Sequence, residues 1–559
     1  MPVSTPSITR IVSAPIPDDA TQYMVPMRDG IRLATDVYLS GSTQQLPIVL
    51  IRLPYDKDGQ YCFIPEIARY FTEHGYHVAA QDVRGKFRSE GNPMLWVNEV
   101  ADSYDTIDWL TKQPYSNGSV AMWGDSYYGF TQLAAAAGAH PALKAIVPRL
   151  TGTTMGSPRR IDPTTQTGDV EMAVTYMYPL THFLHQDSYE WDIDWDQRPF
   201  INQIEEAVSQ IGYRSDTFDL WYPAEVQLPR FPRGSAFNSP PVPMLHTIGW
   251  WDNLAPYAWR DHREIQANHP GWQRMEHLLI ESIDHENNVL GENRGTFERS
   301  ADEIQSLLPA MIDPAIEFFD VYVKGLGKAS DIPKVRYNIA HTQGLRQAES
   351  WPPAGIVKRR LYAHPDGTLT SSCVVSEPVA ATWIHDPDQP VPSYTADAFA
   401  YLLELPDEAP RAQRPDVLTF TAHPVDHDTV LAGPVSVEAT AASSGPKMDL
   451  HVWLLDIAPD GTGTRIARGN LHLADTSDNL DDAVTHTIDC FEVGYLLRAG
   501  HNLQLHIASS DAPEFLVAPG DGSHPLAVTQ TVTNEQQVQL GGPGGLAVSF
   551  HILPDAQKG

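Results

Sequence analysis

Ser126 is the residue whose surroundings most clearly suggest chemistry. It stands in a G-x-S-x-x-G turn within residues 119–138 (SVAMWGDSYYGFTQLAAAAG), where an apolar run precedes the turn and an Ala-rich, helix-like stretch follows it. A nucleophile elbow has this context, because small residues let backbones approach and the sharp turn exposes the hydroxyl. A helix starting there would also direct free N–H groups at an oxyanion. A structural serine in a tight turn is the alternative.

A serine nucleophile needs a base that takes its proton and an acidic residue that orients the base. After a nucleophile elbow these partners follow in the order acid, then histidine, each on a loop behind a later strand. Asp252 follows the apolar run 242–249, and His285 follows the run 277–283. We therefore predict that Ser126, Asp252 and His285 form a catalytic triad.

Three other residues are alternatives for the base or the acid, and their positions in the sequence argue against each of them. His246 stands in the middle of a predicted strand, where packing within the sheet is the expected role. Asp261 falls inside a predicted helix. Asp284 adjoins His285, and a neighbour in sequence is badly placed to reach the ring from its far side.

The elements that would position the triad alternate along the first part of the chain. Apolar runs typical of buried strands alternate with helix-like stretches, which predicts a mostly parallel sheet covered by helices. The predicted strands are 47–54, 76–81, 119–123, 242–249 and 277–283, and the predicted helices are 65–75, 101–113, 128–138 and 313–325.

Two further regions have different patterns. Residues 148–240 are rich in aromatic side chains and lack a buried-strand signal, which predicts an inserted, largely helical cap. From 333 onward, period-two alternation and frequent turn signals predict a β-sandwich, with a jelly roll as its expected form. The predicted domains are therefore a catalytic domain of residues 1–147 and 241–332, a cap of residues 148–240 and a C-terminal domain of residues 333–559.

Composition restricts the class of protein. A chain of 559 residues exceeds what one hydrophobic core supports, so several domains are expected. The formal net charge of −32 and the absence of a Lys/Arg run argue against a nucleic-acid partner. The cysteines Cys62, Cys373 and Cys490 are too scattered for a disulfide framework. Without a signal-peptide core or an 18-residue apolar run, we expect a soluble, cytoplasmic protein with no membrane partner.

The sequence predicts no metal site and no cofactor. Asp192, Asp194 and Asp196 begin like a calcium loop, but Gln197 replaces the required glycine and no glutamate closes the loop. Walker, dinucleotide-binding and H-E-x-x-H motifs are absent from the sequence.

Taken together, the motifs resemble those of the cocaine-esterase-like (CocE/NonD) serine hydrolases of the X-prolyl dipeptidyl-peptidase (S15) superfamily. The matching segments are 25–39, 52–57, 81–91, 124–129, 249–253 and 498–513, with His285 after its strand. The resemblance implies an α/β-hydrolase domain with an inserted helical cap and a C-terminal β-sandwich of jelly-roll type. That division agrees with the patterning.

The resemblance also implies roles for individual residues. It places the nucleophile at Ser126, the acid at Asp252 and the base at His285. It places the oxyanion hole at the backbone N–H of Tyr127 and the hydroxyl of Tyr55. A phenol suits this task because it donates one directed hydrogen bond and stays protonated above neutral pH. Without the resemblance, we would interpret Tyr55 as a packing aromatic.

The segment 81–91 combines family-like and unusual residues. Asp82, Arg84 and Gly85 are family-like, and we expect them to hold this loop near the sheet. Phe87 stands where the family more often has glycine, which predicts a different loop shape beside the site. In the cap, residues 216–223 are the nearest match to the family's aromatic and acidic segment.

The predicted function is cleavage of a carboxylic ester by a serine hydrolase through an acyl-enzyme, with a small-molecule ester or amide as substrate. Alternatives are an X-prolyl dipeptidyl aminopeptidase or an α-amino-acid ester hydrolase, in which Glu171, Asp187 and Asp192 would hold a substrate ammonium. A non-catalytic carbohydrate-binding protein is a further alternative, against which the intact triad argues. A homodimer is one assembly that the sequence allows.

Aromatic side chains near the predicted site are candidates for a substrate pocket. They are Phe130, Trp191, Trp250 and Trp251. Apolar pockets are commonly lined by such side chains, but the same rings could equally belong to the core.

Overall fold

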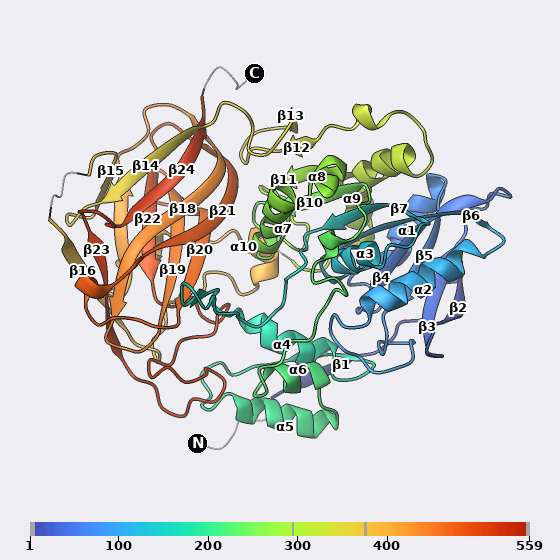
Figure 1. Ribbon diagram of the computed structural model, residues 1–559, viewed down its shortest axis with the longest axis horizontal. Coiled ribbons are helices and arrows are strands. Elements are labelled where there is room, and N and C mark those ends of the chain that lie inside the picture. Colours follow the sequence, from blue (N-terminus) through green and yellow to red (C-terminus); the bar gives the residue numbers. More distant parts are fainter. Residues whose placement is uncertain (1–5, 293, 295, 374–376, 555–559) are drawn as a thin grey trace.

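The computed structural model describes residues 6–292, 294, 296–373 and 377–554. Figure 1 shows a helix-covered sheet on one side, a group of long strands on the other, and short helices below their junction. The predicted fold class is confirmed, whereas the domain boundaries drawn from the sequence stay predictions.

In the described part of the chain, ten strands form the catalytic sheet in the order β13-β12-β11-β10-β7-β6-β4-β5-β3-β2. They are β2 (Ala20–Pro26), β3 (Arg32–Tyr38), β4 (Leu46–Leu53), β5 (His77–Asp82), β6 (Ser116–Asp125), β7 (Leu143–Arg149), β10 (Met244–Gly249), β11 (Glu276–Glu281), β12 (Val335–Tyr337) and β13 (Arg346–Ala348). The strands from β5 to β12 in this order run parallel, and β2, β3 and β13 are antiparallel to their neighbours. The carboxyl ends of β6, β10 and β11 therefore meet at one edge.

Helices cover this sheet because its central strands are buried on both faces. They are α1 (Ile64–Glu73), α2 (Glu99–Thr111), α3 (Ser126–Gly138), α7 (Ala255–Asn268), α8 (Pro270–Met275) and α9 (Ala301–Tyr322). The helix predicted at 313–325 is longer than expected and begins at Ala301. Ser300 and Glu303 form a capping box there, and the internal Pro309 and Pro314 conceal this first half from the sequence pattern.

The inserted segment contains three short α-helices, but contrary to the prediction of a largely helical cap most of its residues lie in turns and loops. It contains β8 (Thr167–Gly168), α4 (Ala173–His182), β9 (Ser188–Trp191), α5 (Ile201–Ile211), α6 (Asp216–Trp221) and the short 3₁₀ turn η1 (Ala236–Asn238). The N-terminal strand β1 (Ile8–Ile11) pairs with β9 and so joins the chain start to the cap.

The C-terminal part is built from strands, as the period-two pattern predicts. They are β14 (Val357–Ala363), β15 (Thr368–Thr370), β16 (Val379–His385), β17 (Leu418–Ala422), β18 (Thr429–Ser443), β19 (Met448–Ile457), β20 (Gly463–Leu473), β21 (Thr485–Leu497), β22 (Asn502–Ala508), β23 (Asn534–Leu540) and β24 (Ala547–Leu553). Its helical pieces are η2 (Ala329–Asp331), η3 (Ala398–Ala400), α10 (Tyr401–Glu404), η4 (Ala409–Gln413) and η5 (Leu480–Asp482). β12 and β13 follow residue 333 yet belong to the catalytic sheet. The sequence did not reveal them, because strands of three residues are too short to show a pattern.

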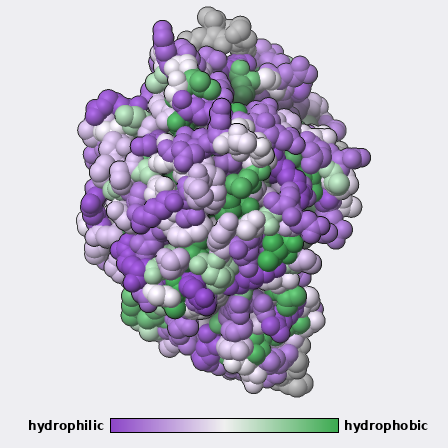
Figure 2. Space-filling model, turned by 90° about the vertical axis from the view of Figure 1, so that its right-hand side faces the viewer, coloured by the Kyte–Doolittle hydropathy of each residue, from purple (hydrophilic) through white to green (hydrophobic). Residues whose placement is uncertain are grey.

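The surface of the molecule is mainly polar on the face that Figure 2 shows. Apolar side chains lie on this face in small, separate groups. Among the described residues, no helix combines the length and the apolar character needed to cross a bilayer.

Candidate active site

The elbow around Ser126 forms as predicted. β6 ends at Asp125 and α3 begins at Ser126, whose φ of 51° is unusual for a residue with a side chain. Gly124, with φ of 149°, is required by close packing, since a Cβ there would lie 2.0 Å from Cδ2 of Tyr128. The strained turn thus places Ser126 at the edge of the sheet and at the start of a helix.

Asp252 and His285 meet at the same edge, behind β10 and β11. The Nδ1 atom of His285 lies 2.8 Å from Oδ1 of Asp252. Only 6% of the His285 side chain and none of the Asp252 side chain is exposed. The same Oδ1 accepts the backbone N–H of Leu254 at 2.9 Å, which fixes the carboxylate's orientation.

The competing residues are engaged elsewhere. His246 is buried in β10, 3.6 Å from Glu276. Asp261 lies in α7 and accepts hydrogen bonds from both the backbone N–H and the hydroxyl of Thr153. Asp284 accepts the backbone N–H of Leu402 at 2.8 Å from the C-terminal part of the chain.

A buried network that the sequence did not reveal ties the elbow to the histidine loop. Arg149 donates through Nε to Oδ1 of Asp125 at 2.7 Å and through Nη2 to Oδ1 of Asn287 at 2.6 Å. Asn287 in turn donates to Oδ2 of Asp125 at 2.8 Å. Because Asp125 directly precedes Ser126 and Asn287 lies two residues after His285, these hydrogen bonds hold the two loops at a fixed spacing.

The Tyr55 hydroxyl lies at the elbow. The Tyr178 hydroxyl of α4 donates to it at 2.9 Å, and the Ser126 side chain is near enough to lower the pKa of the Tyr55 phenol. Burial raises the pKa of Tyr55 above its ordinary value, so the phenol keeps its proton. Tyr178 is a site residue that the sequence did not predict, because it is brought in by the cap.

Tyr127 is held by its own side chain. Its hydroxyl donates to Oε1 of Glu99 at 2.9 Å and its ring stacks on Trp96, with centroids 4.4 Å apart. These contacts fix the first turn of α3, which carries the backbone N–H assigned to the oxyanion hole.

The environment of His285 favours its protonation. Burial lowers the pKa of His285, but the Asp252 carboxylate, together with Glu286 and Asp125, outweighs burial and the net pKa is raised. Phe399 covers the ring, with centroids 4.9 Å apart. The adjoining Glu286, whose pKa is raised by burial, accepts the Tyr61 hydroxyl at 2.8 Å and adds a carboxylate that the sequence analysis did not single out.

The predicted pocket aromatics are dispersed. Phe130 is fully buried beneath Trp96, with ring centroids 4.4 Å apart. Trp250 stacks on Trp259 at 5.9 Å, and Trp251 packs with residues of the C-terminal strands. Trp191 lies on β9, paired with β1.

The carboxylates proposed for an ammonium are also separate. Glu171 accepts the Tyr176 hydroxyl at 2.7 Å, and Asp187 pairs with Arg10. Asp192 is exposed.

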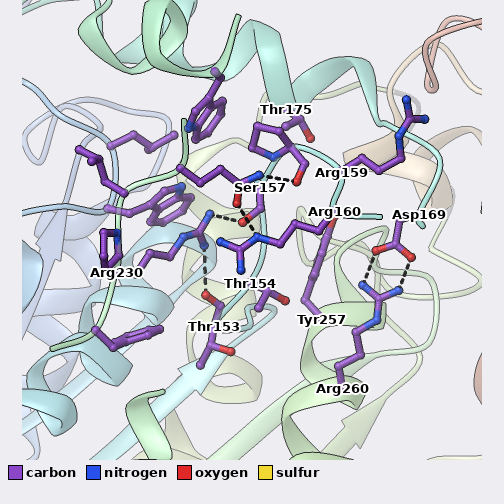
Figure 3. A pocket seen from close by; sticks show the side chains of 18 of the residues that line it. Thr153, Thr154, Ser157, Arg159, Arg160, Asp169, Thr175, Arg230, Tyr257 and Arg260 are labelled. Atoms are coloured by element: carbon purple, nitrogen blue, oxygen red, sulfur yellow. Dashed lines mark hydrogen bonds and ion pairs between the residues drawn. The ribbon is translucent and has the colours of Figure 1, made fainter. Parts of the chain in front are cut away.

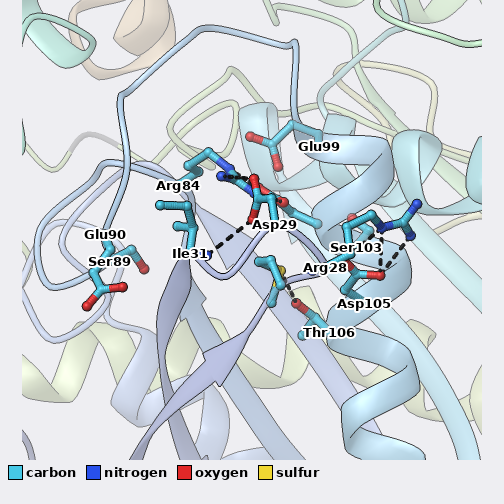
Figure 4. Close-up of polar contacts among 12 residues, drawn as sticks. Arg28, Asp29, Ile31, Arg84, Ser89, Glu90, Glu99, Ser103, Asp105 and Thr106 are labelled. Atoms are coloured by element: carbon cyan, nitrogen blue, oxygen red, sulfur yellow. Dashed lines mark hydrogen bonds and ion pairs between the residues drawn. The ribbon is translucent and has the colours of Figure 1, made fainter.

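The loop 83–91 is anchored from several sides, and Figure 4 shows the ion pair of its Arg84 with Asp29. Arg84 donates to both Asp102 oxygens, at 2.9 and 2.6 Å, and to Oδ2 of Asp29 at 2.7 Å. Lys57 donates to Oδ2 of Asp82 at 3.0 Å. Gly85 has no room for a Cβ, which would lie 2.3 Å from the backbone nitrogen of Pro93.

Phe87 adopts the conformation that favours glycine. Its φ is 46°, and its backbone N–H donates to the Gln186 carbonyl at 2.7 Å. The phenylalanine therefore accepts backbone strain at a position where the resemblance implies glycine.

Comparisons with known proteins agree with this architecture. Residues 29–287 match the X-Pro dipeptidyl-peptidase (S15 family), and residues 328–544 match the X-Pro dipeptidyl-peptidase C-terminal non-catalytic domain. A cocaine esterase from Rhodococcus sp. (strain MB1 Bresler) is 26% identical over 89% of this chain and 91% of its own length.

Solved structures support the same fold. An α-amino acid ester hydrolase superposes with a TM-score of 0.77 at 22% identity, covering 97% of this chain and 98% of the other. A CocE/NonD family hydrolase from Staphylococcus aureus gives 0.66 at 15% identity, covering 99% and 97%. With the S15 catalytic region and the C-terminal domain matched in the expected order, this chain belongs to the X-Pro dipeptidyl-peptidase (S15) superfamily and is similar to the CocE/NonD hydrolases.

Proposed function

We propose that this chain cleaves a carboxylic ester through an acyl-enzyme, with Ser126 as nucleophile, His285 as base and Asp252 as the residue that orients it. The observation that carries the proposal is the buried 2.8 Å contact between His285 Nδ1 and Asp252 Oδ1, beside an elbow serine in a strained conformation. An ionised Asp252 only accepts, so Nδ1 carries the hydrogen and Nε2 keeps its lone pair for the serine proton.

The steps follow from these roles. Nε2 of His285 takes the Ser126 proton as Oγ attacks the ester carbonyl, and the oxyanion accepts hydrogen bonds from the Tyr127 N–H and the Tyr55 hydroxyl. The tetrahedral intermediate collapses when His285 gives the proton to the leaving alcohol. His285 then deprotonates a water, whose oxygen attacks the acyl carbonyl to give a second tetrahedral intermediate. As this intermediate collapses, the bond to Ser126 Oγ breaks and His285 returns the proton to Oγ, which releases the acid and free Ser126.

Ser126→Ala tests this proposal. It should abolish hydrolysis of an aryl ester, since loss of a triad nucleophile costs on the order of 10⁶ in rate, and it should abolish labelling by a fluorophosphonate. Ser119→Ala, a partly buried serine toward the other end of β6, is the matched control and should keep both activities. A Ser126→Ala enzyme with more than about a hundredth of wild-type kcat would remove Ser126 from this role.

A substrate panel separates ester from amide chemistry. Acyl esters with and without a free α-amine, and the matching amides, would be compared by kcat/KM. Preference for the free amine would favour the aminopeptidase or α-amino-acid ester hydrolase alternatives over a simple esterase.

A further inference from the structure

A cavity of about 680 Å³ lies between the cap and the catalytic domain (Figure 3). Its lining comes from the loop after β7, from the cap helices α4 and α6, from residues 227–231 and from α7. Ser126, Asp252 and His285 do not line it. It is therefore a separate space from the triad.

The cavity nevertheless shares walls with the candidate active site. Trp96 lines it and stacks on Tyr127, the residue after the nucleophile. Thr175 of α4 lines it too, one helical turn before Tyr178, which contacts Tyr55. The Trp96 ring and helix α4 therefore stand between the cavity and the residues assigned to the oxyanion hole.

Two of the arginines that line the cavity have acidic partners. Arg260 forms a bidentate pair with Asp169, with both N···O distances 2.7 Å. Nη2 of Arg159 lies 3.6 Å from Oε2 of Glu171. In each of these two pairs the positive charge of the arginine is balanced by a carboxylate of the protein.

Arg230 is held by neutral groups instead. It donates to the carbonyls of Thr153 at 3.1 Å and Met155 at 2.7 Å, and to Oγ of Ser157 at 2.6 Å. Its guanidinium lies 4.5 Å from the centroid of the Trp96 ring. Burial lowers the pKa of Arg230 to about 9, as is typical of a cation without a counter-charge. Among the described residues, no carboxylate lies within ion-pair distance of it.

The two terminal nitrogens of the Arg160 guanidinium are available to a ligand. Its Nε donates to Oε1 of Gln227 at 2.8 Å, while its Nη1 and Nη2 atoms have no hydrogen-bond partner in the described part of the chain. Figure 3 shows the Arg160 and Arg230 side chains converging near Ser157. A guanidinium presents two parallel donors, a geometry that matches a carboxylate.

Two further acids line the cavity, and among the described residues neither lies within ion-pair distance of Arg160 or Arg230. Burial raises the pKa of Asp261 to about 6, and its two oxygens accept from Thr153. Glu264 pairs with His269 at 3.0 Å. The lining thus has four arginines (Arg159, Arg160, Arg230 and Arg260) and four acids (Asp169, Glu171, Asp261 and Glu264). In the described part of the chain, Arg160 and Arg230 are the two of these arginines that form no ion pair with a carboxylate.

We propose that this cavity binds a small organic carboxylate, held by Nη1 and Nη2 of Arg160 and by the buried charge of Arg230. The apolar part of the ligand would lie against Trp96, Trp221 and Phe231, which line the same space. The carboxylate can belong to the ester substrate itself, which rests on the proposed function, or to a separate small molecule that does not react.

Binding is tested first, without turnover. Calorimetry with the wild-type chain would compare benzoate with its neutral amide, benzamide. Benzoate should bind more tightly than benzamide, Arg160→Gln should weaken benzoate at least tenfold, and added salt should weaken it further. Arg214→Gln is the matched control, because this cap arginine pairs with Glu205 and Asp219 outside the cavity. Equal binding of benzoate and benzamide, or an Arg160→Gln variant with wild-type affinity for benzoate, would overturn the proposal.

Kinetics then separate the two sources of the carboxylate. If the substrate supplies it, Arg160→Gln should lower kcat/KM for a glutarate monoaryl ester at least tenfold but leave the neutral methyl aryl diester unchanged. If a separate molecule supplies it, Arg160→Gln should affect both esters alike, while benzoate binding is lost as above. Because calorimetry needs no catalysis, the cavity can be judged even if Ser126 proves not to be the nucleophile.

Discussion

Asp252→Asn is the most informative change to the triad, because it removes one charge and little volume. The carboxylate is fully buried, and its Oδ1 accepts both from Nδ1 of His285 at 2.8 Å and from the N–H of Leu254 at 2.9 Å. In Asp252→Asn, the Leu254 N–H should hold the oxygen of the new amide at the position of Oδ1, facing Nδ1 of His285. The asparagine would then preserve the tautomer of His285 and lose only the negative charge.

The size of the effect follows from that charge. When His285 takes the serine proton, its positive charge is stabilised by Asp252 by about 4 kcal/mol at 4 Å and an effective dielectric constant of about 20. Since about 1.36 kcal/mol is a factor of ten in rate, kcat should fall by roughly 10³ with little change in KM. If the amide turned its nitrogen toward His285, the wrong tautomer would enlarge the loss to about 10⁴.

The assay is steady-state hydrolysis of an aryl ester as a function of pH. Asp252 raises the pKa of His285, so Asp252→Asn should also move the acidic limb of kcat/KM to lower pH. Asp284→Asn is the matched control, since Asp284 is buried beside His285 but accepts from Leu402. An Asp252→Asn enzyme within tenfold of wild type, or a larger loss in Asp284→Asn, would refute the assignment.

The remaining predictions concern the oxyanion hole and pH. Tyr55→Phe should lower kcat by roughly 10²–10³, about 2.7–4 kcal/mol, and slow fluorophosphonate labelling; an enzyme within threefold of wild type in both assays would return Tyr55 to a packing role. Tyr178→Phe removes the 2.9 Å hydrogen bond to Tyr55 and should lower kcat about 2- to 10-fold at unchanged KM. In a Tyr55→Phe background the same change should have little further effect, and a full additive loss in this double-mutant cycle would contradict the coupling. Wild-type kcat/KM should fall as pH drops through the raised pKa of His285, so an acidic midpoint below the ordinary value of 6.5 would contradict its environment.

The sequence alone was informative where local pattern controls structure. The apolar run, the small residues and the Ala-rich stretch around Ser126 predicted the elbow, and the polar residues after two later runs predicted the places of Asp252 and His285. The three residues lie at the same edge of the sheet because parallel strands end there, which brings distant loops together. The family resemblance added Tyr55, which pattern alone would have left as a packing aromatic.

Tertiary structure decided the features that depend on long-range contacts. The Arg149, Asp125 and Asn287 triangle, the Tyr178 hydroxyl and the Phe399 ring come from separate strands, the cap and the C-terminal part of the chain, so no local spacing reveals them. Trp250 and Trp251 are close to Asp252 in sequence, but they do not join the site. Trp250 packs against Trp259, and Trp251 packs against the C-terminal strands. Hydrophobic patterning reports which face of an element is buried, but it does not report what that face is buried against.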